Sequence, residues 1–332
     1  MATNFWTQLK QPIIALAPME GVTDSAFRQL CREQGAAVAY TEFISSDAIA
    51  HRGRTALAKM DFDPAEQPVV CQIFGHDIEA FAKAAKEVEA RGFSGIDINF
   101  GCPARKVVGH GSGAALLRKP AYCRALIESV LGSVSIPLSI KVRSSIRKRS
   151  KEEDPGCQER YTALDLVEAI EDLPVSTIMI HGRSYEMGHS GEVDTEMIQA
   201  VKQRFKGLVL ANGGIKTPED TKRMLEQTGA DGVGIARGSQ GQAWIFRQTR
   251  QYLESGSYDP ISWPEIRALM LRHAELLYER KGRRGMFEIR KHLTWYIRGI
   301  EGASALRQKL VQVESVEQIE KILPQEVTAV EK

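Results

Sequence analysis

The sequence predicts an α/β fold, a barrel of eight parallel strands followed by a smaller all-α domain, and three observations favour it. The 332 residues leave room for one large domain and an appendage. Eight short apolar runs end in glycine or polar residues, and helical patterns separate most of them. After Trp244 this alternation stops, and helical patterns continue from Trp263-Pro264 to about Leu323. We therefore expect a (β/α)8 TIM barrel over residues 1–242 and a helical domain over residues 243–332.

The eight apolar runs are rich in isoleucine and valine, as parallel strands buried on both faces are. They cover Ile13 to Pro18, Val38 to Ile44, Val69 to Phe74, Ile96 to Phe100, Leu138 to Val142, Thr177 to His181, Leu208 to Ala211 and Gly232 to Ala236. The alternative is an open doubly wound sheet, which usually carries a glycine fingerprint after its first strand. Here the first run ends in Pro18-Met19-Glu20-Gly21, without that fingerprint, so the barrel is favoured.

The helices expected between the strands have recognisable ends. Thr217-Pro218-Glu219-Asp220 supplies an N-cap, a proline at the first helical position and two acids, and Gly229 supplies a stop. The segments Asp77 to Gly92 and Asp194 to Gly207 follow the same pattern. A helix expected over Gln242 to Leu253 fits either the eighth barrel unit or a linker to the second domain.

Cysteine usage, hydropathy and charge argue against several classes of protein. The five cysteines are odd in number and form no C-x-x-C pair, so we expect reduced thiols and no metal site. The N-terminus has no basic region leading into an apolar stretch, and no run approaches membrane-spanning length, which predicts a cytoplasmic protein without a membrane partner. The net charge of +2 does not decide on nucleic acid, because clustered positive residues still form a local patch.

One thiol has an unusual position in the segment Gly95 to Pro103. The apolar alternation of this segment ends in a glycine-broken turn, and Cys102 lies beyond it, between Gly101 and Pro103. A buried structural cysteine would more often lie within the alternation. We therefore expect the turn to hold the thiol at a strand tip for nucleophilic, redox or metal-binding chemistry.

The residues expected at the C-terminal ends of the strands, where barrel active sites form, are unusually polar. They include Met19 and Glu20, Glu42, Gln72, Asn99 and Cys102, Lys141 and Arg143, His181 and Arg183, Asn212-Gly213-Gly214, and Ala236-Arg237-Gly238. The last two groups follow strands seven and eight, where barrels often bind a phosphate through backbone N–H groups. Lys141 and His181 suit a cofactor that becomes anionic on reduction, and flavin is the obvious candidate. A lone lysine is usually just solvated, and a lone histidine usually has a structural role. The interpretation therefore depends on both residues lying at the same barrel mouth.

With these motifs, the sequence resembles the tRNA-dihydrouridine synthases, flavoenzymes that reduce uridine in transfer RNA. The resemblance runs through Ala17 to Asp24, Gln72 to Gly75, Asp97 to Pro103, Ile140 to Arg143, His181 to Arg183, Asn212 to Ile215 and Ala236 to Gly238. Arg290 to Tyr296 also resembles part of the C-terminal RNA-binding domain of the family. The tail is most similar to the bacterial B-type branch, whereas Gly111-Ser112-Gly113 and Met19-Glu20-Gly21 are also similar to the C-type branch.

The resemblance implies FMN in the barrel mouth, NADPH or NADH as reductant, and tRNA as the partner of a monomeric enzyme. The residues that it implies around FMN are Pro18, Met19, Glu20, Gln72, Lys141, His181, Asn212, Gly213, Gly214, Ala236 and Arg237. It makes Cys102 the proton donor to uracil C5, with hydride reaching C6 from the flavin. Asn99 and Arg183 would hold the uracil, and Arg105 and Lys106 would lie on a loop that closes over the substrate.

Two basic clusters are candidates for contacts with the RNA backbone. The first comprises Arg143, Arg147, Lys148, Arg149 and Lys151, and the second comprises Arg280, Lys281, Arg283, Arg284, Arg290, Lys291 and Arg298. Acids follow the first cluster directly, so a solvated face explains it equally well. In the second, Arg284, Lys291 and Arg298 recur every seven residues and would share approximately one helix face, which predicts a phosphate track.

Two rival functions remain open from the sequence. A small-molecule flavin reductase of the dihydroorotate or dihydropyrimidine dehydrogenase type shares the barrel, but it would not need the basic tail to bind its small substrate. A non-catalytic RNA-binding protein on a barrel scaffold would not require Cys102, Lys141 and His181 together. We expect the first to turn over a free pyrimidine and the second to bind no flavin.

Overall fold

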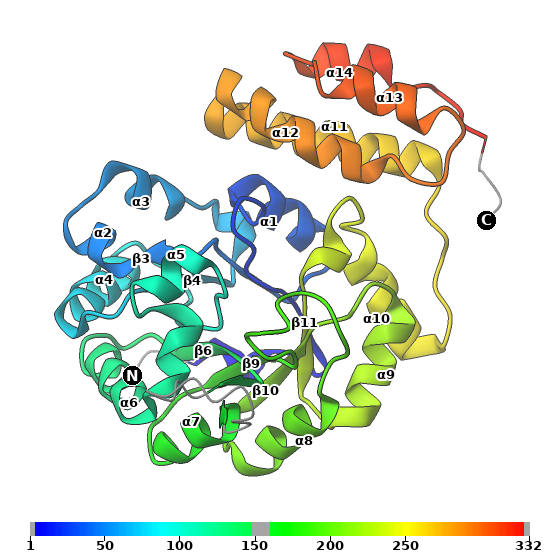
Figure 1. The fold of residues 1–332 in the computed structure, drawn as a ribbon. Helices are drawn as coiled ribbons and strands as arrows, with labels where there is room; N and C mark the ends of the chain where they lie inside the picture. The colour runs from blue at the N-terminus through cyan, green and yellow to red at the C-terminus, as the bar shows by residue number, and fades with distance from the viewer. Residues whose placement is uncertain (1–3, 148–159, 329–332) are drawn as a thin grey trace.

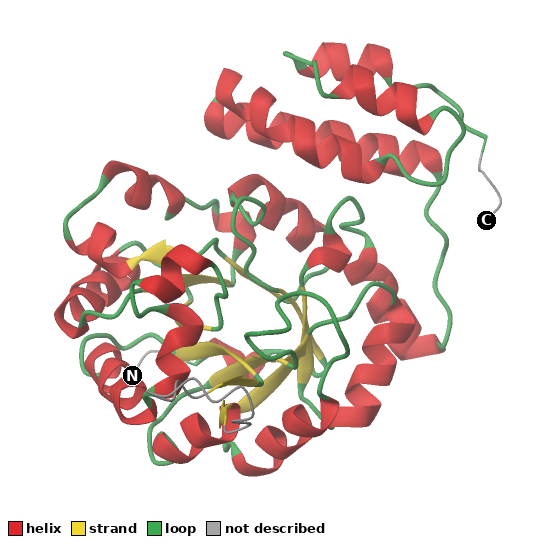
Figure 2. Ribbon diagram, viewed as in Figure 1, coloured by secondary structure: helices red, strands yellow, loops and turns green. Residues whose placement is uncertain are grey.

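The computed structural model describes residues 4–147 and 160–328, and a closed barrel of parallel strands forms its larger part (Figures 1 and 2). The barrel strands are β1 (Ile13–Leu16), β2 (Val38–Tyr40), β3 (Ile44–Ser45), β4 (Val69–Phe74), β5 (Gly95–Phe100), β6 (Leu138–Arg143), β9 (Thr177–His181), β10 (Leu208–Asn212) and β11 (Gly232–Ile235). The sheet closes because β2 pairs in parallel with both β1 and β4. The predicted (β/α)8 TIM barrel with a helical C-terminal region is confirmed.

The second predicted strand is interrupted. The run Val38 to Ile44 forms β2 and β3 with three residues between them, because the Thr41 hydroxyl accepts the N–H of Gln72 at 3.0 Å, where a continuous ladder would offer a carbonyl. A second difference is the short antiparallel pair β7 (Ser145–Arg147) and β8 (Arg160–Thr162), which the sequence did not predict.

Helices surround the barrel, and the N-caps predicted for three of them are confirmed, whereas the helix predicted to stop at Gly207 ends at Arg204. They are α1 (Ser25–Glu33), α2 (Ser46–Ala50), α3 (Arg54–Lys59), α4 (Ile78–Ala90), α5 (Arg105–Gly109), α6 (Pro120–Leu131), α7 (Ala163–Ala169), α8 (Thr195–Arg204), α9 (Pro218–Thr228) and α10 (Ile245–Ser255), with 3-10 turns η1 (Phe5–Gln8), η2 (Pro64–Glu66), η3 (Gly113–Arg118) and η4 (Arg237–Ser239). Thr217 and Asp220 form a capping box on α9, and Gly229 ends that helix with a φ of 64°. Asp77 and Asp194 cap α4 and α8.

The alternation of side chains along each strand separates two cores. Odd-numbered residues of β5, such as Asp97 and Asn99, face the barrel interior, whereas Ile96, Ile98 and Phe100 pack under the helices. The lower interior is apolar and is filled by Trp6, Ile13, Ala15, Ala17, Val38, Tyr40, Val70, Met179 and Leu210. Inward-facing polar residues are therefore concentrated toward the C-terminal ends of the strands.

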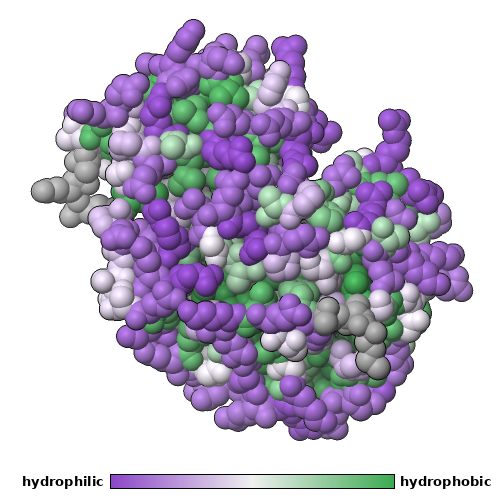
Figure 3. Space-filling model, turned by 180° about the vertical axis from the view of Figure 1, so that it is seen from behind, coloured by the Kyte–Doolittle hydropathy of each residue, from purple (hydrophilic) through white to green (hydrophobic). Residues whose placement is uncertain are grey.

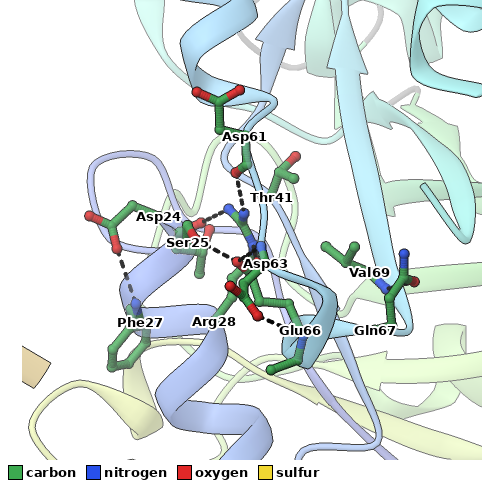
Figure 4. Close-up of polar contacts among 12 residues, drawn as sticks. Asp24, Ser25, Phe27, Arg28, Thr41, Asp61, Asp63, Glu66, Gln67 and Val69 are labelled. Carbon is green, nitrogen blue, oxygen red and sulfur yellow. Dashed lines mark hydrogen bonds and ion pairs between the residues drawn. The ribbon is translucent and has the colours of Figure 1, made fainter. Parts of the chain in front are cut away.

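A buried ion pair fixes the segment that enters α1 (Figure 4). Arg28 and Glu66 are 1% and 0% exposed, and Arg28 Nε lies 2.6 Å from Glu66 Oε2. Arg28 also donates to the carbonyls of Thr23 and Asp61 at 2.8 and 3.0 Å, while Ser25 Oγ donates to Glu66. These bonds satisfy both buried charges and hold the loop between β1 and α1 at the barrel mouth.

Replacement of Glu66 by glutamine is expected to lower the free energy of unfolding by about 3–5 kcal/mol, because it leaves the Arg28 charge buried without its partner. Urea denaturation followed by circular dichroism measures the change. Glu254→Gln is the matched control, since it breaks the exposed pair of Glu254 with Lys10 and should leave stability unchanged. Equal denaturation midpoints for the two variants would contradict this account.

The helical region consists of α11 (Trp263–Lys281), α12 (Arg283–Tyr296), α13 (Ala303–Leu310) and α14 (Val316–Ile322). Figure 1 shows it above the barrel, with α10 beside α9 in the ring of barrel helices. α11 packs against α1, where the Phe27 ring lies 5.4 and 5.8 Å from the rings of His273 and His292. Both parts present mainly hydrophilic residues on the face in Figure 3. No helix within the two described ranges is long and apolar enough to cross a membrane.

Candidate active site

A cavity of about 1050 Å³ opens at the C-terminal ends of the barrel strands. Every residue predicted around the cofactor lines it, and so do Cys102, Asn99, Arg183 and Arg298. Its volume is at the upper end of the range for small-molecule and cofactor sites. The cavity therefore brings together residues that lie far apart in the sequence, from Pro18 after β1 to Arg298 after the last turn of α12.

A chain of hydrogen bonds runs from the barrel interior to the Gly-Cys-Pro turn. Gln72 Nε2 donates to Asp97 Oδ2 at 2.7 Å, and Asn99 Nδ2 donates to Gln72 Oε1 at 2.9 Å. Asn99 Oδ1 then accepts the N–H groups of Gly101 and Cys102 at 3.0 and 2.8 Å. Asn99 thus builds the turn that carries the thiol, in addition to lining the cavity where the uracil is expected.

Asp97 was not among the predicted site residues, although the sequence contains a signal for it. Asp97 is two residues before Asn99 in an otherwise apolar strand. Side chains two residues apart in a strand point to the same face, so Asp97 and Asn99 both face the barrel interior. Neighbouring strands supply its partners, because the register pairs Asp97 with Gln72 on β4 and with Ser139 on β6.

The Cys102 thiol is largely enclosed, with 9% of the residue exposed. Burial raises the pKa of Cys102, and this outweighs the opposing effects of the Ala104 N–H and of the Arg143 charge. The thiol is therefore protonated at neutral pH and can act as an acid. Arg143 holds the turn from the other side, since its Nε donates to the Gly101 carbonyl at 2.8 Å.

Arg143 is a structural residue here rather than a free RNA contact. It is 1% exposed, and its Nη1 donates to the carbonyls of Ser184 and Gly188 at 3.0 and 2.7 Å. These bonds join the Cys102 turn to the loop after β9. Arg143 of the first basic cluster is therefore buried. Lys148, Arg149 and Lys151 of the same cluster lie outside the described residues.

Lys141 and His181 face the same cavity with different charges. Burial lowers the pKa of Lys141 to about 8, so its ammonium is largely retained at neutral pH, and Nζ donates to Asn212 Oδ1 at 3.1 Å. Burial and the nearby Lys141 charge hold the pKa of His181 far below its usual value, which keeps the imidazole neutral. His181 Nε2 lies 3.3 Å from Arg183 Nη1. Lys141 alone of this pair can supply a positive charge.

The glycines after β10 form a narrow part of the cavity wall. Gly213 and Gly214 have φ angles of 117° and 75°, in the region that favours glycine. A Cβ atom on Gly213 would lie 2.7 Å from the His181 ring, so a side chain there would displace the histidine. After β11, Arg237 lines the same end of the cavity, and its Nη2 donates to the His189 carbonyl at 3.1 Å.

Glu20 lies at the rim, where it is anchored by Lys59 of α3. Lys59 Nζ is 2.5 Å from Glu20 Oε1 and 3.6 Å from Glu42 Oε1, and Glu42 accepts the N–H of Gly21 at 2.6 Å. Desolvation raises the pKa of Glu20 against the opposing hydrogen bond from Lys59. This cluster fixes the Met19-Glu20-Gly21 turn.

The predicted RNA-binding residues lie in three places. Arg105 and Lys106 are exposed at the start of α5, directly after the Cys102 turn. Arg284 is exposed on α12 and pairs with Glu288 at 2.9 Å. Arg298 lies beyond the end of α12 at Tyr296, and it lines the cavity while donating to the Gln240 carbonyl at 3.3 Å.

The seven-residue series therefore does not continue along one helix. Arg284 and Lys291 share α12, but the helix ends before Arg298, and Gly299 with a φ of 65° follows. Lys291 donates to the Gly21 carbonyl, and so it ties α12 to the loop after β1. Arg290 turns toward α13 and α14, donating to the Val313 carbonyl at 2.9 Å.

Several cations of the second cluster hold the helical region on the barrel. Arg280 pairs with Asp63 at 2.5 Å, and Lys281 pairs with Asp24 at 2.7 Å and with Glu288 at 2.6 Å. Asp63 and Asp24 belong to the barrel and are distant in the sequence from the cations that they meet, so these two pairs join the helical region to the barrel. Of the seven-residue series, Arg284 is exposed on α12, and Arg298 lines the cavity.

Comparisons with known proteins show which family the chain resembles. A model of the dihydrouridine synthase (Dus) family matches residues 15–331. The chain is 34% identical over 314 residues to the probable tRNA-dihydrouridine synthase 1 of Synechocystis sp., which covers 94% of this chain and 85% of that protein. It is 36% identical over 292 residues to tRNA-dihydrouridine synthase B of Shewanella oneidensis, covering 87% of each, and 33% identical over 306 residues to that of Pseudomonas aeruginosa, covering 92% and 89%.

Solved structures show the same fold at low sequence identity. Histamine dehydrogenase from Rhizobium sp. 4-9 superposes with a TM-score of 0.54 and 12% identity over 80% of this chain. The chain spans about half the length of that structure, 49%. The resemblance inferred from the sequence motifs is confirmed by the family model and the relatives, and the chain belongs to the dihydrouridine synthase family of oxidoreductases.

Proposed function

We propose that this protein is a tRNA-dihydrouridine synthase that uses FMN and a nicotinamide cofactor, NADPH or NADH, to reduce the C5–C6 bond of particular uridines in tRNA. The observation that carries the proposal is that the enclosed Cys102 thiol and Lys141 line one cavity, where burial raises the pKa of the thiol. Family membership supports it over the small-molecule pyrimidine reductase considered above. We propose further that the enzyme acts as a monomer in the cytoplasm, where its substrate would be found.

The residues of the cavity fit FMN. The glycine turn at Gly213 and Gly214 can approach a phosphate closely, and Arg237 offers a cation at the same end. Lys141 Nζ, half-buried on β6, suits the pyrimidine edge of the ring, where negative charge develops on reduction. Pro18, Met19, Gln72 and Asn212 supply further lining. When bound, FMN would supply the hydride that adds to uracil C6.

Cys102 would complete the reduction by giving its Sγ proton to uracil C5. One hydride at C6 and one proton at C5 saturate the bond, so no other reactant is needed at the base. Burial keeps the thiol protonated until the substrate arrives, and the charges of Arg143 and Lys141 then stabilise the thiolate. Asn99 holds both the turn and, with Arg183, the uracil.

A uridine in folded tRNA must be unstacked before it can enter the cavity. Arg298 and Arg183 line the mouth and would receive the phosphates and the base. Arg284 would continue this contact along α12, while Arg105 and Lys106 would act from α5, beside the thiol. Glu20, tied to Lys59, would form the opposite rim.

Purified protein should carry FMN and should convert uridine to dihydrouridine in unmodified tRNA on addition of NADPH. Dihydrouridine mapping in tRNA from a strain lacking the protein, with and without its restoration, identifies the position. A protein that reduces free uracil or orotate but leaves tRNA unchanged would refute the proposal.

The double reversal Arg284→Glu and Arg298→Glu is expected to weaken tRNA binding at least tenfold at physiological salt and to flatten the salt dependence of the affinity, because two phosphate contacts are lost. Filter binding across a salt series measures both, and flavin content should not change. Arg204→Glu is the control, since this partly exposed arginine at the end of α8 lies toward the opposite end of the barrel. Unaltered affinity in the double variant would remove these residues from the RNA contact.

A further inference from the structure

A buried carboxylate begins the hydrogen-bond chain that ends at Cys102. Asp97 is 0% exposed inside the barrel, and it accepts hydrogen bonds from Ser139 Oγ at 2.6 Å and from Gln72 Nε2 at 2.7 Å. Burial raises the pKa of Asp97 to about 6, so the group remains largely ionised at neutral pH. A buried charge is costly to a fold, and none of the chemical steps proposed above uses this one.

The carboxylate determines the orientation of two amides in succession. An ionised carboxylate only accepts hydrogen bonds, so Gln72 must turn its NH2 group toward Asp97. The carbonyl oxygen of Gln72 then faces Asn99 and accepts from its Nδ2 at 2.9 Å. The side-chain oxygen of Asn99 must therefore point away from Gln72, toward the Gly-Cys-Pro turn.

That oxygen is what the Gly-Cys-Pro turn requires. Asn99 Oδ1 accepts two backbone N–H groups, from Gly101 at 3.0 Å and from Cys102 at 2.8 Å. A reversed Asn99 amide would face these N–H groups with another donor, and both bonds would be lost. The same orientation leaves one further N–H on each of Gln72 and Asn99, so toward a ligand both amides offer donors that suit carbonyl oxygens.

We propose that Asp97 is a positioning residue that fixes, through Gln72 and Asn99, the turn that holds the Cys102 thiol toward the substrate. Asp97 touches neither substrate nor cofactor in this role. Its effect on turnover rests on the proposed function, whereas its effect on the thiol does not.

Two neutral replacements separate the acceptor from the charge. Asp97→Asn retains an oxygen that Gln72 can donate to, and Asp97→Leu retains none, while both remove the negative charge beside Lys141. Asp97→Ala serves if the leucine variant does not fold. Ser139→Ala is the matched control, because it removes the other hydrogen bond of the same carboxylate and leaves the Gln72 path intact.

The first measurement is the pH dependence of Cys102 alkylation by iodoacetamide in the flavin-loaded protein, followed by mass spectrometry of the Cys102 peptide. The second is kcat and KM for tRNA at pH 8. In the leucine variant we expect a shifted alkylation profile and a fall in kcat on the order of 100-fold, the loss typical of a misplacement of about 1 Å, with an unchanged KM. The asparagine variant should keep an alkylation profile and a kcat close to those of the wild type, and the Ser139→Ala control should match the wild type.

Two results would overturn the inference. One is an unchanged alkylation profile and kcat in the leucine or alanine variant, and the other is an asparagine variant as impaired as the leucine variant. If the wild-type protein fails to reduce uridine in tRNA while the alkylation profiles follow the expected order, the proposed function falls and the role of Asp97 stands.

Discussion

Replacement of Cys102 by alanine is expected to slow dihydrouridine formation severely while FMN binding and flavin reduction by NADPH continue. The thiol is enclosed at the cavity, and its raised pKa keeps it protonated, so its loss removes the proton for uracil C5 without altering the cofactor contacts. Loss of a positioned general acid typically costs 10²- to 10⁴-fold in rate, about 3–5 kcal/mol of barrier. Stopped-flow absorbance measures flavin reduction, and mass spectrometry of digested tRNA measures the product.

The matched control for this experiment is Cys123→Ala. Cys123 is another buried thiol, on α6, and its Sγ donates to the Leu116 carbonyl at 3.2 Å, away from the cavity. This variant should lose some stability and keep full turnover. Wild-type dihydrouridine formation by the Cys102 variant would eliminate the thiol as the acid.

Replacement of Lys141 by methionine is expected to reduce turnover by about 10²- to 10³-fold, the usual loss when one donor to a developing negative charge is removed. Methionine keeps the length of the side chain and deletes the half-buried charge that lies beside Asn212. Flavin retention on gel filtration should also weaken. Single-turnover oxidation of the reduced enzyme by tRNA separates the chemical step from cofactor loss.

Lys141 also predicts the pH dependence of stability in the flavin-free protein. Its folded pKa of about 8 lies below the ordinary lysine value, so between about pH 8 and 10.5 the unfolded chain binds more protons than the folded one. The contribution of Lys141 to the free energy of unfolding therefore rises through this window, by up to about 3 kcal/mol. Below pH 8 it is constant. Urea denaturation at a series of pH values measures the rise, and the Lys141→Met variant should lack it; parallel curves for the two proteins would contradict the lowered pKa of Lys141.

Local sequence patterns were enough to place the strands and to gather the cavity residues. Short Ile- and Val-rich runs followed by polar residues identify parallel strands, and the barrel geometry puts all of their C-terminal ends at one mouth. Cys102, Lys141, His181 and the Asn212-Gly213-Gly214 turn could be brought together on this basis, although they come from four strands. Caps were equally predictable, as Thr217 shows, because the capping groups lie within one helical turn.

Interactions between segments distant in the sequence were not predictable in this way. The break after Tyr40 depends on a Thr41 hydroxyl that meets β4, and the pairing of Arg280 with Asp63 depends on how α11 packs on the barrel. The heptad spacing of Arg284 and Arg298 predicted a common face, yet α12 ends between them. In each case the deciding contact joins residues that only the folded chain brings within hydrogen-bonding distance.

The sequence by itself determined the fold class, the family and which residues line the cavity. Each of these follows from hydrophobic periodicity and from the order of short motifs along the chain. The tertiary structure decided which of those residues are free to act. It occupies Lys291 with the Gly21 carbonyl, encloses the Cys102 thiol, and connects Asn99 to a buried Asp97 through Gln72. Burial and hydrogen-bond partners set the protonation and orientation of a side chain, and both are properties of the packed molecule rather than of its sequence.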